Sequence, residues 1–334
     1  MRHILIIFSI FLFGITIISC GGDGSSSSSD NSSSTTSDDD TTSSDNTTVN
    51  TKLYVSVGES GTILTSSDNG TTWTSRTSGT SLTLAGVYYG NSTYLVLGDY
   101  GTILTSSDGI TWTSRTSGTT SHLYGVSYGN NKFVVVGDSG TILTSSDGIT
   151  WTSRTSGTSE LLRRISYGNS TFVVVGKTAN SNDNGTILTS SDGITWTSRT
   201  SGTSYYLRDV TFGNNTFVTV GFLGQYGTIL TSSDGITWTS RTSGTSNGML
   251  GVTYGDNNFV VVGQYGTILT SSDGTSWDNR TSGISNFLSG VTYGDNTLVT
   301  VGDTGTTLTS SDGITWTSRT SGTSKYLFGV IYSD

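Results

Sequence analysis

The sequence predicts an all-β protein, a seven-bladed β-propeller of four-stranded antiparallel blades. The phrase GTILTSSDGITWTSRTSGTS recurs with few changes along the chain and contains all 7 tryptophans, which are 39, 39, 45, 42, 39 and 39 residues apart. Self-similarity at a period near 40 residues is typical of propellers and solenoids. The chain also has 45 glycines and no proline, which favours short strands joined by tight turns of Gly, Asn and Asp.

Each repeat contains four strand-like segments. In the second complete copy we expect strands at 123–128, 132–136, 141–146 and 150–156. The second segment is apolar on both faces, as expected for a strand between two neighbouring sheets. The last segment alternates along its length, which indicates an exposed edge strand. The intervening Gly-Asn-Asn, Gly-Asp-Ser-Gly and Asp-Gly-Ile stretches are suited to tight turns.

The two ends of the repeat region predict a closed ring. The chain finishes with a single copy of the first strand, 327–332, and the repeat region begins with a copy of the second strand, 52–57. Together they complete a seventh unit, so the N- and C-terminal strands are expected to share one blade. An open solenoid would need polar capping repeats, and the sequence contains no recognisable cap. An open β-solenoid remains the alternative.

The first 19 residues have the features of a signal peptide and are excluded from the fold. Arg2 and His3 precede an apolar run, 4–18, that is too short for a comfortable membrane span. The stretch Ile-Ile-Ser-Cys-Gly at 17–21 resembles a bacterial lipoprotein signal, which implies lipid attachment at Cys20, the only cysteine. We therefore expect an extracytoplasmic protein of the bacterial cell envelope, anchored by lipid. The alternatives are an ordinary secretory signal and a weak N-terminal anchor.

Residues 20–50 are expected to form a disordered tether for the domain at 51–334. After Cys20 the segment consists almost entirely of Gly, Ser, Thr, Asp and Asn, with Val49 as its one apolar residue. Such a composition buries too little surface to offset the entropy of ordering. The rest of the chain has 14 basic and 18 acidic residues. That balance argues against nucleic acid as a partner, because binding its phosphates normally requires a basic face.

The repeated phrase contains a recognisable motif. The segment 66–73, SSDNGTTW, matches S-x-D-x-G-x-T-W, and the other six copies are one residue shorter in the turn. The chain thereby resembles the Asp-box (BNR-type) propellers, which include sialidases, sortilin-like receptors and photosystem II assembly-factor-like proteins, over essentially all of 52–334. The resemblance implies a folded hairpin in which the Asp accepts hydrogen bonds from turn amides and the Trp packs beneath. It assigns structural roles to Asp68, Trp73, Asp108, Trp112, Asp147, Trp151, Asp192, Trp196, Asp234, Trp238, Asp273, Trp277, Asp312 and Trp316.

The fourth strand carries one arginine in every copy. Because the position recurs, we expect these arginines to form a solvated rim whose charge discourages edge-to-edge pairing. They are Arg76, Arg115, Arg154, Arg199, Arg241, Arg280 and Arg319.

The copies differ mainly in the link to the next blade and in the turn between the second and third strands. Both connections leave the same end of an antiparallel blade, and varied loops on a rigid scaffold usually carry binding. Two consecutive copies depart most: they place charged pairs in the first strand and lengthen the following turn. The predicted ligand or partner site is Glu160, Arg163, Arg164, Lys177, Tyr205, Tyr206, Arg208, Asp209, Phe222 and Tyr226. Neutral drift of a duplicated array is the alternative.

Catalysis is not indicated by the residues available. The chain has only two glutamates, Glu59 and Glu160, and its histidines, His3 and His122, form neither a triad nor a metal cluster. A glycosidase needs two carboxylates across a cleft, and a pair such as Asp209 with Glu160 carries no motif. We therefore expect no catalytic residues, metal or cofactor. The predicted function is a membrane-tethered, non-catalytic propeller that binds a protein, peptide or glycan, with an assembly or scaffolding role implied by the resemblance. A secreted glycan-active hydrolase is the alternative.

Overall fold

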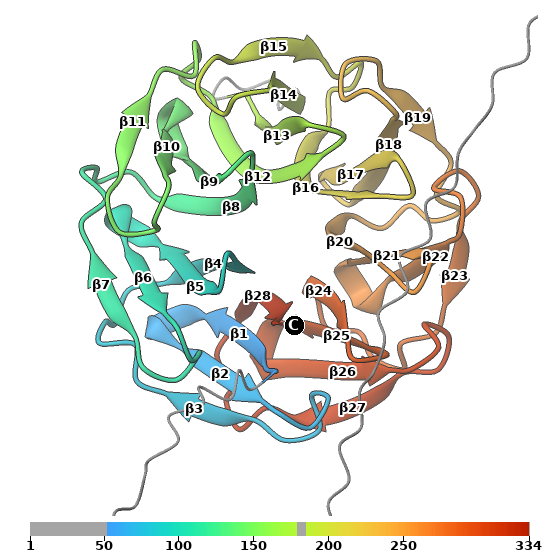
Figure 1. Ribbon diagram of the computed structural model, residues 1–334. Coiled ribbons are helices and arrows are strands. Elements are labelled where there is room, and N and C mark those ends of the chain that lie inside the picture. Colours follow the sequence, from blue (N-terminus) through green and yellow to red (C-terminus); the bar gives the residue numbers. More distant parts are fainter. Residues whose placement is uncertain (1–51, 179–184, 334) are drawn as a thin grey trace, which may run out of the picture. The chain divides into compact units, whose positions relative to one another are not determined.

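The protein is a closed ring of seven four-stranded antiparallel sheets, as Figure 1 shows for the computed structural model. The structure describes residues 52–178 and 185–333. The predicted fold class, blade number and strand number per blade are confirmed. In these two stretches no helix is long and apolar enough to cross a membrane. The predicted signal and tether, including Cys20, lie outside the described residues, as do 179–184 of the lengthened turn.

The strands follow the sequence repeat, four to a blade. The blade shared by both ends contains β28 (Leu327–Tyr332), β1 (Tyr54–Gly58), β2 (Ile63–Ser66) and β3 (Thr74–Arg76). The next three contain β4 (Leu84–Gly90), β5 (Thr93–Gly98), β6 (Ile103–Ser106) and β7 (Thr113–Arg115); β8 (Leu123–Gly129), β9 (Lys132–Gly137), β10 (Ile142–Ser145) and β11 (Thr152–Arg154); and β12 (Leu161–Gly168), β13 (Thr171–Lys177), β14 (Gly185–Ser190) and β15 (Thr197–Thr200).

The remaining three blades contain β16 (Tyr206–Gly213), β17 (Thr216–Leu223), β18 (Tyr226–Ser232) and β19 (Thr239–Arg241); β20 (Met249–Gly255), β21 (Asn258–Gly263), β22 (Ile268–Ser271) and β23 (Asp278–Arg280); and β24 (Leu288–Gly294), β25 (Thr297–Gly302), β26 (Thr306–Ser310) and β27 (Thr317–Thr320). Five blades have a single 3-10 turn between their second and third strands. These turns are η1 (Glu59–Gly61), η2 (Asp99–Gly101), η3 (Asp138–Gly140), η4 (Gln264–Gly266) and η5 (Asp303–Gly305).

The ring is closed by pairing between β28 and β1, as the sequence predicted. Val55 lies opposite Ile331 in this antiparallel pair. Ser333, which is 1% exposed, accepts a hydrogen bond from the Leu53 amide at 2.9 Å and one from the Tyr94 hydroxyl of the next blade. The closing strand therefore contacts both its own blade and the following one.

The core lies between the blades. Val134 and Val136 of β9 pack with Ile165 and Phe172 of the following blade, and Trp196 packs against the same cluster. All of these except Trp196 are at most 6% exposed. The two-sided apolar pattern of the second strand thus reflects burial on both faces, as expected for a strand between two sheets.

The fourth strand is shorter than predicted, which corrects the expectation of 150–156. In β11 only Thr152–Arg154 pairs with β10, and the chain soon bends at Gly157, whose φ is 77°. The rim arginines are also less solvated than expected. The Nε of Arg154 donates to Thr144 Oγ1 at 2.8 Å, and the same bond recurs in every blade. Each arginine therefore fastens the edge strand to its neighbour.

The Ser-Asp-Gly turn between the third and fourth strands is held by its aspartate. In the second blade Asp108 Oδ1 accepts the amides of Ile110 and Thr111, both at 2.8 Å, and the Ser106 hydroxyl at 2.8 Å. These bonds hold the pKa of Asp108 down at about 2, although partial burial acts in the opposite direction. The carboxylate thus closes the turn by accepting two of its amides and the serine hydroxyl.

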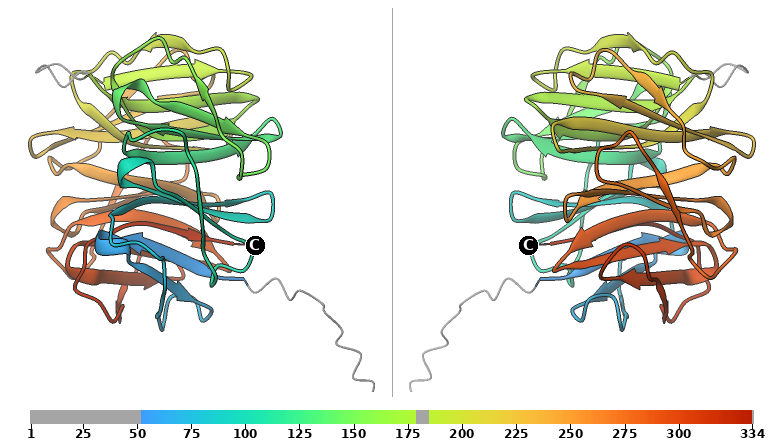
Figure 2. Two further views of the ribbon diagram at one scale, coloured as in Figure 1. Left: turned by 90° about the vertical axis from the view of Figure 1, so that its left-hand side faces the viewer. Right: turned by 90° about the vertical axis from the view of Figure 1, so that its right-hand side faces the viewer.

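The two ends of the blades form two different faces of the ring. Asp99 of η2 donates its amide to the Thr83 carbonyl in the incoming link. At the opposite end, Lys132 beside a Gly-Asn turn donates to the Asp192 carbonyl of the next blade's Ser-Asp-Gly turn. We call the end with the turns between second and third strands, such as η2, the variable face. We call the end with the Gly-Asn and Ser-Asp-Gly turns the uniform face. The loops on the two sides of the ring are visible in Figure 2.

Candidate functional site at the channel mouth

The first strand of each blade borders the channel and contains a β-bulge. In β12, Leu162 pairs with Gly176 but Arg164 pairs with Val175, so Arg163 is an extra residue on that strand. The same register shift occurs in all seven inner strands. Because a bulge breaks the alternation of side chains, the residue before it and the residue after it cannot be assigned to opposite faces from sequence alone.

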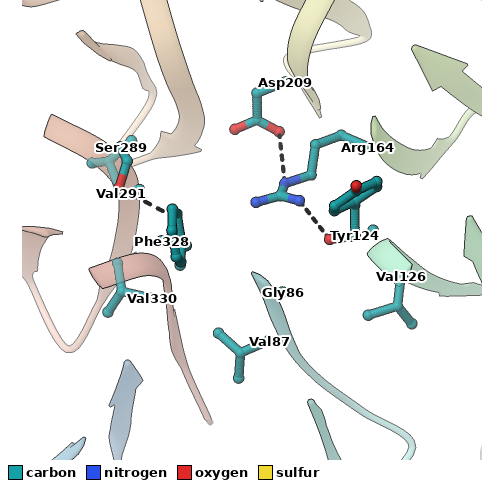
Figure 3. Close-up of a pocket in the computed structure, with 13 residues that line it drawn as sticks. Gly86, Val87, Tyr124, Val126, Arg164, Asp209, Ser289, Val291, Phe328 and Val330 are labelled. Carbon is teal, nitrogen blue, oxygen red and sulfur yellow. Dashed lines mark hydrogen bonds and ion pairs between the residues drawn. The ribbon is translucent and has the colours of Figure 1, made fainter. Parts of the chain in front are cut away.

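Arg164 and Asp209 meet inside the channel. Arg164 Nε lies 3.9 Å from Asp209 Oδ1, and the guanidinium donates to the carbonyl of Tyr124 (Figure 3). The guanidinium also donates to the carbonyl of Ala85 at 3.2 Å. Asp209 accepts the amides of Val210 and Val252, each at 2.9 Å. A small cavity of about 80 Å³ borders the pair. The two side chains therefore link the inner strands of five consecutive blades.

The electrostatics of this pair follow from its partial enclosure. Burial raises the pKa of Asp209, while the Arg164 charge and the two amides act in the opposite direction. Burial lowers the pKa of Arg164, and Asp209 opposes that effect. Both side chains are only 20% exposed. Both side chains already bind protein groups, so we interpret the pair as a structural contact between blades and not as an open ligand site.

Arg163 lies at the channel mouth and stacks on an aromatic ring. Its guanidinium carbon is 4.4 Å from the centroid of Tyr124, which belongs to the preceding blade. Arg163 is 8% exposed, and its Nε has no hydrogen-bond partner. Burial lowers the pKa of Arg163, and the nearby charge of Arg208 lowers it further. An enclosed cation beside a second cation is unfavourable unless an opposite charge joins it.

A second group surrounds Tyr206. Lys177 Nζ lies 5.5 Å and Arg208 Cζ 5.9 Å from the centroid of this ring, and Phe222 packs against it at 5.6 Å. Four of the predicted site residues thus come together at one point. The contacts are at or near the range in which cation–π attraction acts, so the ring helps to hold two positive charges on the variable face.

The remaining predicted residues are more peripheral. Glu160 and Tyr205 are half-buried in the links that precede β12 and β16. Tyr226 is 54% exposed at the start of β18. The structure therefore does not gather the ten predicted residues in one pocket. It divides them into the channel pair, the mouth and the outer loops.

Three aromatic residues of the mouth, Tyr124, Tyr326 and Phe328, were not among the predicted site residues. Tyr124 supports Arg163, and Tyr326 stacks on Phe328 at 4.6 Å with an interplanar angle of 19°. Burial raises the pKa of Tyr326, whereas the charges of Arg208 and Arg163 lower it. The repeat alignment could have identified two of them, because Tyr124 and Phe328 occupy the same bulge position as Arg163 and Arg208. We define the mouth cluster as Arg163, Arg208, Tyr124, Tyr206 and Tyr326.

The two arginines of the mouth cluster have no carboxylate partner in the part of the chain that the structure describes. Across residues 52–178 and 185–333, no carboxylate forms an ion pair with Arg163 or Arg208. The carboxylate of Asp138 accepts the Tyr124 hydroxyl at 3.0 Å instead. Guanidinium groups set among aromatic rings suit a carboxylate or another planar anion, which they bind with two parallel hydrogen bonds.

Nothing in the described part of the chain assembles a metal site, because no three His, Cys, Asp or Glu residues there lie close enough to hold an ion. The carboxylate pair considered for hydrolysis, Asp209 with Glu160, is also unsuited to it. Both oxygens of Asp209 accept backbone amides, whereas a glycosidase needs carboxylates that face the scissile bond.

The closed ring of seven sheets makes this protein a seven-bladed β-propeller. Several solved propeller structures are similar to it. A structure of YCF48 bound to D1 peptide superposes with a TM-score of 0.62 at 18% identity, over 79% of this chain and 90% of that one. YCF48 from Cyanidioschyzon merolae gives 0.59 at 18%, over 78% and 96%. A catalytically inactive virginiamycin B lyase from Staphylococcus aureus with quinupristin gives 0.63 at 14%, over 76% and 92%. At these identities the similarity shows the fold alone. No family model and no curated protein matches the chain.

Proposed function

We propose that this protein is a non-catalytic binding module whose variable face holds an anionic group of a protein, peptide or glycan at the mouth cluster. The observation that carries the proposal is the enclosed Arg163, whose Nε has no partner and whose neighbour is a second arginine. A folded protein retains such an arrangement at a cost to stability. An anionic ligand would offset that cost.

Two comparisons support binding without deciding the ligand. One similar propeller was solved with a peptide and another with a quinupristin ligand. Propellers that share this fold therefore bind ligands of different chemistry, because the ligand is selected by the residues of the site and not by the fold. An assembly or scaffolding role for this chain is part of the proposal.

The proposal includes a membrane tether through lipid on Cys20. The described chain begins at the uniform face, where the Tyr54 hydroxyl donates to the carbonyls of Gly294 and Thr297 beside a Gly-Asp-Asn turn. The described part of the chain therefore starts on the face opposite the mouth. Replacing Cys20 with Ala should abolish the incorporation of a labelled fatty acid into the protein. Incorporation that persists in the variant would contradict lipid attachment at Cys20.

Selection from a random peptide library tests the mouth directly. The full chain in detergent should enrich peptides with Asp, Glu or a free carboxyl terminus. Arg163→Gln with Arg208→Gln should abolish that enrichment, whereas Arg319→Gln on the outer edge should leave it unchanged. A parallel panel of sulfated and uronic acid oligosaccharides covers an anionic glycan. Equal binding by the mouth variant and the control would overturn the proposal.

The alternative of a glycan-active hydrolase has a separate test. Chromogenic glycosides and polysaccharides should show no turnover above that of the denatured protein. Turnover that Asp209→Asn or Glu160→Gln abolishes, with folding preserved, would favour the enzyme instead.

A further inference from the structure

Three blades have similar grooves on the outer part of the variable face. Their volumes are about 710, 690 and 470 Å³. Each lies between the turn that joins the second and third strands and the loop that follows the fourth strand. Tyr100 borders the first groove and Tyr265 the second, whereas Ser139 has the equivalent place in the third. The mouth cluster does not contribute to any of them.

Tyr100 and Tyr265 hold an unfavourable backbone conformation. Their φ angles are 53° and 55°, and each precedes a glycine that also has positive φ. Such turns favour Asn, Asp or Gly at this position, and a left-handed conformation costs other residues about 1–2 kcal/mol. Ser60 and Ser139 occupy the same position in other blades. Folding therefore requires no aromatic residue there.

Burial does not offset the cost of these two tyrosines. Tyr100 is 65% exposed and Tyr265 is 55% exposed. Each ring is nevertheless supported by a ring from the link that leads to the next blade: His122 lies 5.0 Å from Tyr100, and Phe287 lies 5.4 Å from Tyr265 in an edge-on arrangement. The rings are thus held in place at the surface, which lowers the entropy lost when a ligand packs against them.

The chemistry of the groove beside Tyr100 favours a ligand rich in hydroxyls. Apart from Tyr100 and Arg115, its walls are Ser, Thr and Gly, and no aliphatic side chain is present. A protein partner usually needs an apolar anchor in such a place. A sugar ring instead has hydroxyls along its edge and a C–H face that packs on an aromatic ring. Arg115 is the one charged side chain in the walls, and its Nε already donates to Thr105 Oγ1 at 2.8 Å, so a neutral saccharide fits best.

We propose that the grooves beside Tyr100 and Tyr265 are two related binding sites for a neutral polysaccharide. The second groove shares the Ser and Thr walls and adds the side chains of Asn247, Asn279 and Ile284. Each tyrosine provides a stacking surface, and the serine and threonine hydroxyls of the groove exchange hydrogen bonds with the sugar. Two weak sites on one face suit a polymer that repeats its own binding unit, because joint binding multiplies the affinity. These sites are independent of the anionic ligand proposed for the mouth.

Affinity electrophoresis of the full chain in detergent tests this proposal. The gels contain hydroxyethyl cellulose, xylan, galactomannan or glycol chitin as probes. At least one probe should retard the protein. Tyr100→Ser or Tyr265→Ser should weaken that interaction about tenfold, near the upper value of one aromatic contact, and the double variant should abolish it. Serine is native at this turn position, so all three variants should fold.

A gain of binding provides the decisive control. Ser139→Tyr should create a third site and strengthen retardation by the same probe, whereas Arg163→Gln with Arg208→Gln should have no effect. If no probe retards the protein, or if the Tyr100→Ser and Tyr265→Ser double variant is retarded like the original, the proposal is wrong. Since the mouth variant is scored separately, failure here leaves the function proposed for the mouth unaffected.

Discussion

Arg164 and Asp209 occupy, in two adjacent blades, the position at which the other five inner strands have glycine. The register of the first and second strands aligns them with Gly86, Gly125, Gly251, Gly290 and Gly329. The only long side chains at this level of the channel thus contact one another, at 3.9 Å. Two changes in a repeated array thus compensate each other, so we expect their effects on stability to be coupled.

Breaking the channel pair should destabilise the fold. Asp209→Gly leaves Arg164 without its carboxylate and two amides without their acceptor, and bonds of this kind contribute about 1.5–3 kcal/mol. We expect a loss of about 2 kcal/mol in the free energy of unfolding, measured by urea denaturation. The double variant Arg164→Gly with Asp209→Gly restores the glycine ring and should lose less than the sum of the single variants. Strict additivity would mean that the two residues are not coupled.

The mouth arginines should show opposite effects on stability and binding. Arg208→Gln removes a positive charge beside the enclosed Arg163, so the free energy of unfolding should rise by about 0.5 kcal/mol or stay unchanged. Binding of the acidic peptides should fall in the same variant. A thermal melt together with a binding titration measures both. A clear loss of stability would instead indicate that Arg208 holds the fold together.

The Ser-Asp-Gly turns should make the protein sensitive to acid. The Thr150 and Ile149 amides hold the pKa of Asp147 down to about 2, and the Thr315 and Ile314 amides do the same for Asp312. An unfolded Asp titrates near 3.9, so the stabilisation is complete above that pH. It is lost as the pH falls toward 2.

The variant Asp147→Asn isolates this effect in one blade. Its deficit in free energy of unfolding relative to the original protein should be largest above pH 5 and should shrink between about pH 4 and pH 2. Denaturant titrations followed by circular dichroism at several pH values provide the measurement. A deficit that stays constant across this range would show that the carboxylate charge is not what stabilises the turn.

Ser333 should contribute strongly to closure of the ring. Ser333→Gly restores the residue that ends the other inner strands, but it removes the partner of the buried Leu53 amide and of the Tyr94 hydroxyl. Leaving buried polar groups unpaired costs about 1–3 kcal/mol. Urea denaturation should show a loss of that size. Unchanged stability would mean that water replaces the serine at both groups.

The fold was predictable because periodic information survives in the sequence. The recurrence of the tryptophans predicted the number of blades, and the single strands at 52–57 and 327–332 predicted the closure of the ring. The length of the fourth strand was not predictable in this way. The alternating pattern runs from Thr150 to Ser156, but only Thr152–Arg154 pairs with β10. Trp151 itself belongs to the preceding turn.

The candidate site was only partly predictable because it depends on contacts between blades. Arg163 and Arg164 are adjacent in sequence, yet the bulge places one over Tyr124 and the other beside Asp209. No pattern within one repeat specifies which neighbour each arginine meets. Tyr326 belongs to the last link and approaches Arg208 only because the ring closes. Its role could not be inferred from either residue alone.

The sharing of one blade between β28 and β1 has a consequence for biogenesis. The strands that open the repeat region emerge first from the ribosome and must wait for the final ones before their sheet is complete. Six blades can form in sequence, but the last gap is filled only after nearly the whole polypeptide is made. A product of premature termination would therefore keep an unpaired edge and be an easy target for proteolysis.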